Sequence, residues 1–113
     1  MNGVSQLMNV TVQDLGSIEL IPLGEGRVFQ ASSTMIAIFR TRSGKLFATQ
    51  AECPHKAGPL ADGIIGEKTV ICPLHANKFD IETGKPLGNE CAPLKTYLVE
   101  ISNGRILLTT NDL

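Results

Sequence analysis

Short runs of alternating apolar and polar residues recur along the chain, and many of them are rich in β-branched residues. Alternation with a period of two is typical of strands that are buried on one face. The pattern predicts strands at residues 10–12, 18–21, 27–30, 35–40, 46–49, 69–71, 78–81, 95–101 and 105–109. The helical expectation is limited to one short turn at the start of the segment Thr11 to Ile18. The chain is therefore expected to be all-β.

Turn-forming pairs separate these runs. Ser43-Gly44, Thr83-Gly84 and Asn103-Gly104 each join a small polar residue to a glycine. An Asn-Gly pair suits a two-residue hairpin, because both central residues must adopt positive φ. We expect Asn103-Gly104 to connect the last two strands in this way.

The stretch from Glu52 to Pro93 differs from the rest of the chain, because it holds five of the six prolines. Proline cannot donate a ladder hydrogen bond, so a central strand is not expected there. We expect a loop-rich subdomain at about 52–93, inserted into an antiparallel β-sandwich. A chain of 113 residues suits one hydrophobic core, so residues 1–113 are predicted to form a single domain.

Composition and charge argue against several kinds of partner. The formal net charge is -1 and no basic arm or stripe is visible, so nucleic acid is not expected to bind. The longest apolar run, Met35 to Phe39, is far shorter than the roughly 20 residues that cross a bilayer. Residues 1–10 contain no Lys or Arg and resemble neither a secretory signal nor a transit peptide. We expect a soluble, cytoplasmic protein without a membrane anchor.

The three cysteines point to metal or redox chemistry, because an odd number in a short chain does not suit a disulfide scaffold. Two of them lie beside the two histidines of the chain, in Cys53-Pro54-His55 and Cys72-Pro73-Leu74-His75. Each motif offers one thiolate and one imidazole, and its proline helps to fix a sharp bend. The spacing predicts one metal centre held by Cys53, His55, Cys72 and His75.

The order of these ligands bears on the identity of the metal. Zinc also accepts two cysteines and two histidines, but a zinc finger usually places both cysteines before both histidines. In a Rieske 2Fe-2S centre, both thiolates bind one iron and both imidazoles bind the other. Two facing loops that each supply one ligand to each iron would produce the order Cys, His, Cys, His. A zinc-stabilised binding module remains the alternative.

At these motifs the chain resembles the Rieske ferredoxin family, which includes Rieske-bearing small subunits of NAD(P)H nitrite reductase. The resemblance runs through residues 53–60, 62–63, 72–75, 78–80 and 83–84. It implies a Rieske-like antiparallel β-sandwich with a 2Fe-2S cluster at one exposed tip and both histidines facing solvent. It also implies a third, proline-containing loop over the cluster, where we place Pro93.

The resemblance implies an electron carrier rather than a catalyst. Such a carrier takes single electrons from a reductase and passes them to a terminal oxidoreductase such as a dioxygenase. The alternative is the small subunit of an NAD(P)H-dependent nitrite reductase, which would bind the large subunit of that enzyme. Residues 23–27, 39–40 and 53–56 resemble that subunit. The chain is expected to be an electron-transfer protein or subunit, and no catalytic residues are assigned.

The resemblance also bears on the reduction potential. High-potential members of the family carry a disulfide between the two ligand loops and hydroxyl groups near the cluster. The matching positions here hold Gly58, Leu74, Asn77 and Phe79, which cannot form that disulfide and include no hydroxyl. We therefore predict a potential nearer about -150 mV than about +300 mV.

Other residues of chemical interest are given structural roles. Cys91 has no histidine partner and is expected to be a small buried hydrophobe rather than a ligand. Lys56 and Lys78 are expected to be ordinary exposed lysines. The remaining candidates are expected to lie in turns or to accept hydrogen bonds there; they are Gly24, Gly26, Asp62, Asp80 and Glu82.

Overall fold

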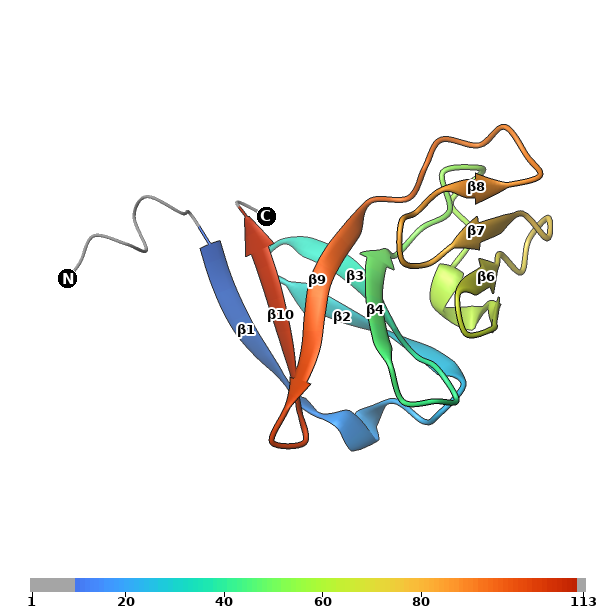
Figure 1. The fold of residues 1–113 in the computed structure, drawn as a ribbon. Helices are drawn as coiled ribbons and strands as arrows, with labels where there is room; N and C mark the ends of the chain where they lie inside the picture. The colour runs from blue at the N-terminus through green and yellow to red at the C-terminus, as the bar shows by residue number, and fades with distance from the viewer. Residues whose placement is uncertain (1–9, 112–113) are drawn as a thin grey trace.

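The computed structural model describes residues 10–111, and six of its strands form one curled antiparallel sheet (Figure 1). The order of these strands across the sheet is β1-β10-β9-β4-β3-β2. Their bounds are β1 (Val10–Ser17), β2 (Glu25–Ala31), β3 (Thr34–Arg40), β4 (Leu46–Gln50), β9 (Thr96–Ser102) and β10 (Arg105–Asn111). We call this sheet the base. The predicted all-β fold is confirmed.

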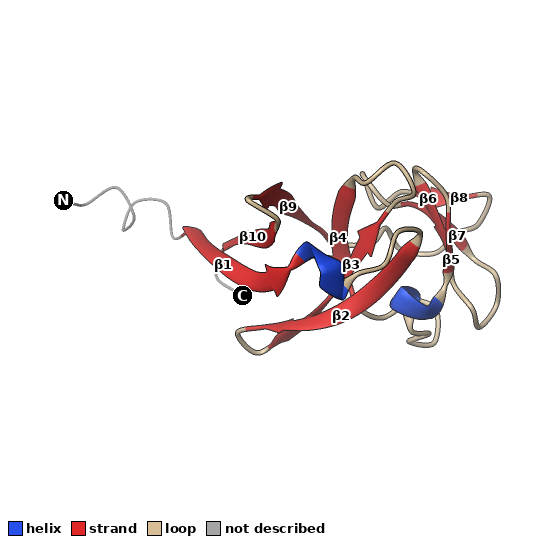
Figure 2. Ribbon diagram, turned by 90° about the horizontal axis from the view of Figure 1, so that it is seen from below, coloured by secondary structure: helices blue, strands red, loops and turns tan. Residues whose placement is uncertain are grey.

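Residues 51–94 form a second unit at one end of the base, which we call the small lobe (Figure 1). Its sheet has the order β5-β6-β7-β8, and each strand has only two or three residues. The bounds are β5 (Ile64–Ile65), β6 (Thr69–Ile71), β7 (Lys78–Asp80) and β8 (Pro86–Leu87), preceded by the 3-10 turn η2 (Leu60–Asp62). Most of the small lobe is loop, as the tan segments of Figure 2 show. Within residues 10–111, no helix is long and apolar enough to cross a membrane.

Strand β3 is buried on both faces, and this explains how the two units pack together. Ile36 and Ile38 belong to the apolar cluster inside the curled base. Ala37 and Phe39 point to the other face, as expected from alternation along a strand, and pack with small-lobe residues that include Phe79. The small lobe therefore packs on the outer face of β3.

The chain leaves the base and returns to it at one place. The N–H of Gln50 donates to the Lys95 carbonyl oxygen (2.9 Å), and the N–H of Lys95 donates to Gln50 Oε1 (2.7 Å). The Gln50 side chain also donates to the Glu52 carbonyl oxygen (2.7 Å). Gln50 thus joins the end of β4 to both ends of the small lobe.

The strand predicted at Ile18–Ile21 is wrong, because this segment contains the 3-10 turn η1 (Ile18–Leu20). The Ser17 side chain accepts the N–H of Glu19 (3.0 Å), and the N–H of Ile21 donates to the Ile18 carbonyl oxygen (3.1 Å). Such a cap stabilises a turn against an extended conformation. The short helical turn expected at the start of Thr11 to Ile18 is also wrong, because residues up to Ser17 belong to β1, which pairs with β10, and the helical turn begins only at Ile18.

The hairpin between β9 and β10 forms as predicted. Asn103 has φ of 52° and Gly104 has φ of 73°, the positive values that an Asn-Gly turn requires. Gly44 and Gly84 also adopt positive φ in the two other predicted turns. The short strands β5 and β8 were not predicted from the alternation, because two residues do not establish a period.

Candidate metal centre

Two loops of the small lobe close with the same pair of backbone hydrogen bonds. In each, the N–H of the cysteine donates to the carbonyl oxygen five residues on, and the cysteine carbonyl oxygen accepts the N–H four residues on. The bonds are Cys53 to Gly58 (2.8 Å) and Ala57 to Cys53 (2.9 Å) in the first loop, and Cys72 to Asn77 (2.8 Å) and Ala76 to Cys72 (3.0 Å) in the second. We call residues 53–58 and 72–77 the first and second ligand loops. The two loops are thus built alike.

The tips of both ligand loops require left-handed backbone. Lys56 and Ala57 have φ of 65° and 56° in the first loop, and Ala76 has φ of 57° in the second. This conformation costs roughly 1–2 kcal/mol for a residue that carries a Cβ. Strain of this kind persists where the surroundings enforce it, and it is concentrated at functional sites. Both ligand loops therefore share a left-handed conformation near their ends.

The two thiols at the start of the ligand loops are buried and adjacent. Cys53 is 2% exposed and Cys72 is 1% exposed. Burial raises the pKa of the Cys53 thiol, and its hydrogen bond with the Cys72 thiol raises that pKa further, whereas the N–H of His55 lowers it. A bound metal ion reverses this preference, because it favours the thiolate. The pair suits two thiolate ligands of one iron.

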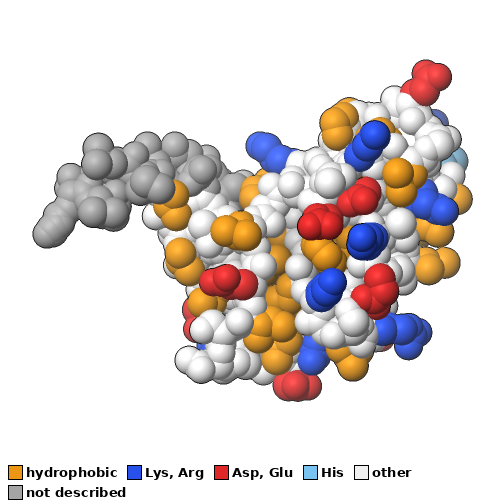
Figure 3. Space-filling view, viewed as in Figure 1, with side chains coloured by type: hydrophobic (Ala, Val, Ile, Leu, Met, Phe, Trp, Pro, Cys, Tyr) orange, Lys and Arg blue, Asp and Glu red, His pale blue; other side chains and the backbone are white. Residues whose placement is uncertain are grey.

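The two imidazoles also lie together, on the side of the loops that meets solvent. The ring centroids of His55 and His75 are 5.0 Å apart, with an angle of 54° between the ring planes. His55 is half-buried and His75 is exposed. Figure 3 shows histidine atoms in pale blue at the far end of the small lobe, away from the base. The loops therefore bring the predicted ligands together as two pairs, one of thiols and one of imidazoles.

The donor set fits a two-iron cluster. Among residues 10–111, no three His, Cys, Asp or Glu side chains converge on a single ion position. A Rieske cluster needs only two protein ligands at each iron, and the site offers a pair of thiols and a pair of imidazoles.

Gly58 allows the two ligand loops to approach each other. A Cβ at this position would lie 2.5 Å from Cys72 Sγ and 3.3 Å from the Leu74 Cβ atom. Any larger residue would displace a predicted ligand. Positions 58 and 74 thus face each other, and neither carries a sulfur.

A third segment, residues 88–94, lies against the ligand loops. The Asn89 side chain donates to the Lys78 carbonyl oxygen (3.0 Å) and accepts the N–H of Cys91 (3.0 Å). Cys91 is half-buried and packs against the apolar cluster that contains Cys53 and Cys72. The prediction that Cys91 is a buried hydrophobe is confirmed only in part, because the side chain is half-buried, and its packing against the cluster of Cys53 and Cys72 was not predicted. The sequence signal that could have indicated this location is Pro93, which lies two residues after Cys91 and was predicted to belong to the covering loop.

Asn77 and Phe79, which bear on the reduction potential, lie at the end of the second ligand loop and just after it. The Asn77 Nδ2 atom is 3.5 Å from His55 Nδ1, at the outer limit of a hydrogen bond. Phe79 is fully buried in the apolar cluster of the small lobe. A shallow cavity of about 400 Å³ opens beside His55, and its lining residues are Pro54, His55, Asn77, Asn89, Glu90 and Cys91.

The turn residues have mixed outcomes. Asp80 accepts the N–H groups of Glu82 and Thr83 (both 2.9 Å), which lowers the pKa of its carboxyl, and its predicted role in a turn is confirmed. Gly24 lies in a turn with φ of 81°. The turn predicted at Gly26 is wrong, because this residue is buried inside β2. A Cβ there would lie 2.8 Å from Phe39 Cδ1, so the glycine permits close packing.

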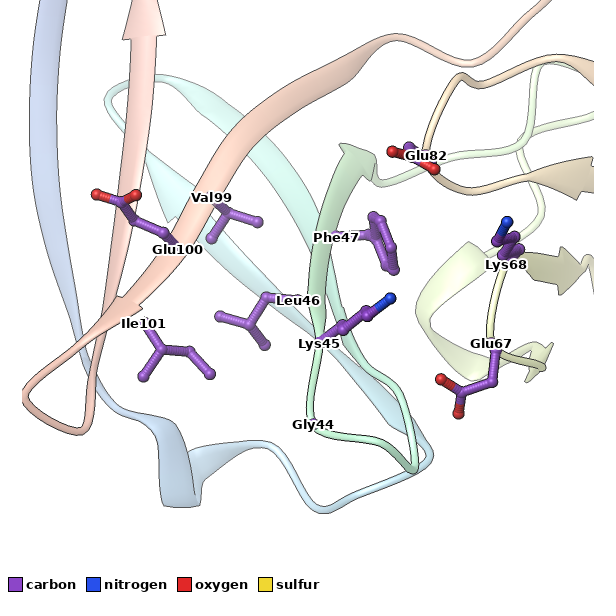
Figure 4. A pocket seen from close by; sticks show the side chains of 10 residues that line it. All are labelled: Gly44, Lys45, Leu46, Phe47, Glu67, Lys68, Glu82, Val99, Glu100 and Ile101. Atoms are coloured by element: carbon purple, nitrogen blue, oxygen red, sulfur yellow. The ribbon is translucent and has the colours of Figure 1, made fainter.

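A second cavity of about 400 Å³ lies between the base and the small lobe (Figure 4). Leu46 and Val99 point into the gap between β4 and β9, and Lys45 points toward the small lobe (Figure 4). Its lining holds charges of both signs but no thiol or imidazole. This cavity is separate from the candidate metal centre.

Comparison with known proteins identifies the family. Residues 12–109 match the family model described as a Rieske-like 2Fe-2S domain. The chain is 35% identical over 99 residues to the ferredoxin component of the naphthalene 1,2-dioxygenase/salicylate 5-hydroxylase systems of a Ralstonia species, covering 84% of this chain and 91% of the relative. An all-β domain with paired Cys and His ligands on two matching loops is thus a Rieske-type domain. The chain belongs to the Rieske-like 2Fe-2S domain family.

Solved structures agree with this assignment. The ferredoxin of carbazole 1,9a-dioxygenase from Nocardioides aromaticivorans has a TM-score of 0.77 at 25% identity, covering 87% of this chain and 96% of that one. The NADH-dependent nitrite reductase small subunit from Mycobacterium tuberculosis has a TM-score of 0.83 at 18% identity, covering 92% and 98%, and shows a shared fold. The cofactor of this chain is a Rieske 2Fe-2S cluster, and its function is one-electron transfer.

The structure shows what the chain itself contributes to this function. The cluster, when bound, accepts and releases one electron. The buried thiols lie in an apolar cluster that keeps water from one side of the site. The imidazole pair lies on the solvent side of the site, where His75 is exposed and within reach of a partner protein.

Proposed function

We propose that this chain carries electrons from a reductase to a terminal oxygenase, with a Rieske cluster held by Cys53, His55, Cys72 and His75. The thiolates of Cys53 and Cys72 would bind one iron, and the imidazoles of His55 and His75 the other. The main support is the pair of matching ligand loops, which place two buried thiols together and two imidazoles 5.0 Å apart. Two ligands of each kind are what the cluster requires.

The relatives favour an oxygenase as the acceptor. The Ralstonia relative is a component of a dioxygenase system, and the ferredoxin component of the naphthalene 1,2-dioxygenase system of Pseudomonas putida is 32% identical over 105 residues. That alignment covers 88% of this chain and 97% of the relative. A second candidate is the small subunit of a nitrite reductase, supported by the fold shared with the Mycobacterium tuberculosis subunit.

We also propose that residues 1–113 act as one Rieske domain, with a cluster-binding subdomain at about 52–93. The mutual hydrogen bonds of Gln50 and Lys95 at the two ends of this segment support the boundary. A cytoplasmic location is proposed because Cys91 carries a free thiol, which suits a reducing compartment.

The cluster assignment is tested by metal and sulfide analysis of protein purified without oxygen. We expect about two irons and two acid-labile sulfides per chain with a Rieske EPR spectrum. A colourless protein with one zinc would instead support a binding module. Iron that cannot be introduced even by reconstitution would contradict the proposal.

The acceptor is tested by reconstitution with purified components. The reduced carrier is mixed with the oxygenase component of a dioxygenase system or with the large subunit of a nitrite reductase, and electron transfer is followed by optical absorption. Reversible transfer to the oxygenase supports the proposal. A stable complex with the nitrite reductase subunit, and no transfer to the oxygenase, would select the second candidate.

The low potential is tested by spectroelectrochemistry. The absence of hydroxyl groups at Phe79 and of sulfur at positions 58 and 74 favours a midpoint nearer about -150 mV than about +300 mV. A midpoint above roughly +100 mV would contradict this proposal.

A further inference from the structure

The outer face of strands β2 and β3 carries two exposed apolar side chains, Val28 and Met35, beyond the area that the small lobe covers. Ala37 and Phe39 are fully buried beneath the small lobe. Val28 pairs directly with Ala37, and Met35 lies two residues before it, so both side chains belong to the same face. Val28 is nevertheless 43% exposed and Met35 is 49% exposed. The small lobe leaves this end of an apolar face uncovered.

A groove of about 600 Å³ lies where the uncovered face meets the first ligand loop. Its residues are Val28, Ser33, Thr34, Met35, Gln50, Ala51, Glu52, Ala57 and Pro59. Ala57 is part of the first ligand loop, and Pro59 follows this loop directly. The same loop carries His55, so it is both a wall of the groove and an edge of the metal centre.

We propose that the groove extends the docking surface of the metal centre and receives an apolar side chain of the redox partner, with a basic group beside it. The inference rests on the proposed function. Because the His55 and His75 rings are 5.0 Å apart, a partner that covers this pair also reaches the first ligand loop, and the groove begins at that loop. One partner surface can therefore contact both.

The chemistry of the groove selects the occupant. Met35 is unbranched and adapts to side chains of different shape, and the alanines and proline add apolar walls. Glu52 is the only charged residue of the lining, so a basic group of the partner would complement it. An apolar centre with a polar rim is the usual composition of a protein interface.

The test compares Met35→Ser with a matched control, Leu98→Ser. Leu98 is 65% exposed on β9, outside the groove lining, so the control removes a similar apolar area elsewhere. Each variant is reduced and mixed with the component that accepts electrons from the wild-type chain in the reconstitution above. We expect Met35→Ser to raise KM for the carrier by about fivefold with little change in kcat, as for a contact worth about 1 kcal/mol. Leu98→Ser should match the wild type.

Two further measurements separate docking from damage to the cluster. The rate of oxidation by ferricyanide and the midpoint potential should be the same in Met35→Ser and wild type, because a small oxidant needs no groove. Glu52→Lys should raise KM by at least about twofold. Added salt should lower the KM of this variant, because screening weakens the repulsion between like charges, whereas it should raise the KM of the wild type.

The outcomes are distinguishable. If the wild-type chain passes electrons to no partner, the proposed function fails, and the inference fails with it. If the wild type is active but KM is unchanged in both Met35→Ser and Glu52→Lys, only the groove is overturned. A wild-type dimer that Met35→Ser makes monomeric, with unchanged KM, would show that a second copy occupies the groove, which also overturns the proposal.

Discussion

The base and the small lobe are stabilised in different ways. In the base, β2 and β3 pair over seven residues, and the interior is filled with aliphatic side chains such as Ile36, Ile38 and Ile106. In the small lobe, no strand among the described residues exceeds three residues, and the two thiols of the proposed ligands belong to the apolar cluster. The base therefore combines long strand ladders with an aliphatic interior, whereas the small lobe has short ladders and a core to which Cys53 and Cys72 contribute.

The largest effect is expected from Cys72→Ser, which removes a proposed ligand. The visible absorption and the Rieske EPR signal should disappear completely, while far-UV circular dichroism should still report the strands of the base. Cys91→Ser is the matched control and should retain both signals, because Cys91 is not among the proposed ligands. A full Rieske spectrum in Cys72→Ser would remove this residue from the site.

The second largest effect, on the free energy of unfolding, is expected from Ile38→Ala in the interior of the base. Ile38 is fully buried, and the substitution should lower the free energy of unfolding by about 2–5 kcal/mol. The EPR spectrum of the folded protein should not change, because Ile38 and the thiols belong to separate clusters. Denaturant unfolding measures the first effect, and Val12→Ala, at a 58% exposed position, is the control, with an expected change within about 0.5 kcal/mol.

A comparison of two glycines tests the loops of the small lobe. Gly84 and Gly88 both have positive φ, at 83° and 74°, so alanine at either should cost about 1 kcal/mol. At Gly84 the new Cβ would also overlap the Leu94 carbonyl oxygen, whereas at Gly88 nothing lies within 4 Å. Gly84→Ala should therefore destabilise the protein by about 1–3 kcal/mol more than Gly88→Ala. Equal effects in thermal unfolding would show that residues 84 and 94 can separate freely.

The smallest effect is expected from Tyr97→Phe at high pH. Burial raises the pKa of the Tyr97 phenol, and the ring packs against the cluster inside the base. The folded state therefore favours the neutral phenol, and this contribution is present below pH about 10 and is lost as pH rises through the raised pKa. Stability of the wild type should fall more steeply above pH 10 than that of Tyr97→Phe. Parallel curves would assign the alkaline loss to other groups.

Local patterns in the sequence predicted most strands of the base, and they also revealed the two candidate ligand motifs. Alternation predicted long strands such as Met35–Arg40, and the Asn103-Gly104 pair predicted the turn that it forms. Both signals depend only on residues that are neighbours in the sequence. The ligand motifs were recognisable because each thiol and its imidazole are close in sequence. At Ile18–Leu20 a side-chain cap at Ser17 outweighed the β-branched composition.

Features that depend on distant contacts could not be predicted in the same way. Gly26 resembles a turn residue in sequence, and only the approach of Phe39 and η2 explains it. The groove beside Met35 exists because the small lobe covers one end of an apolar face and not the other. No periodicity in the chain contains that information.

The meeting of Gln50 and Lys95 has a consequence for protein engineering. Because the two ends of the small lobe are hydrogen-bonded neighbours, residues 51–94 amount to a cassette that replaces an ordinary hairpin turn between β4 and β9. Such a cassette could be transplanted between two adjacent antiparallel strands of another scaffold without changing the path of the host chain. Its recipient would also need an apolar surface like that of Ala37 and Phe39 to support it.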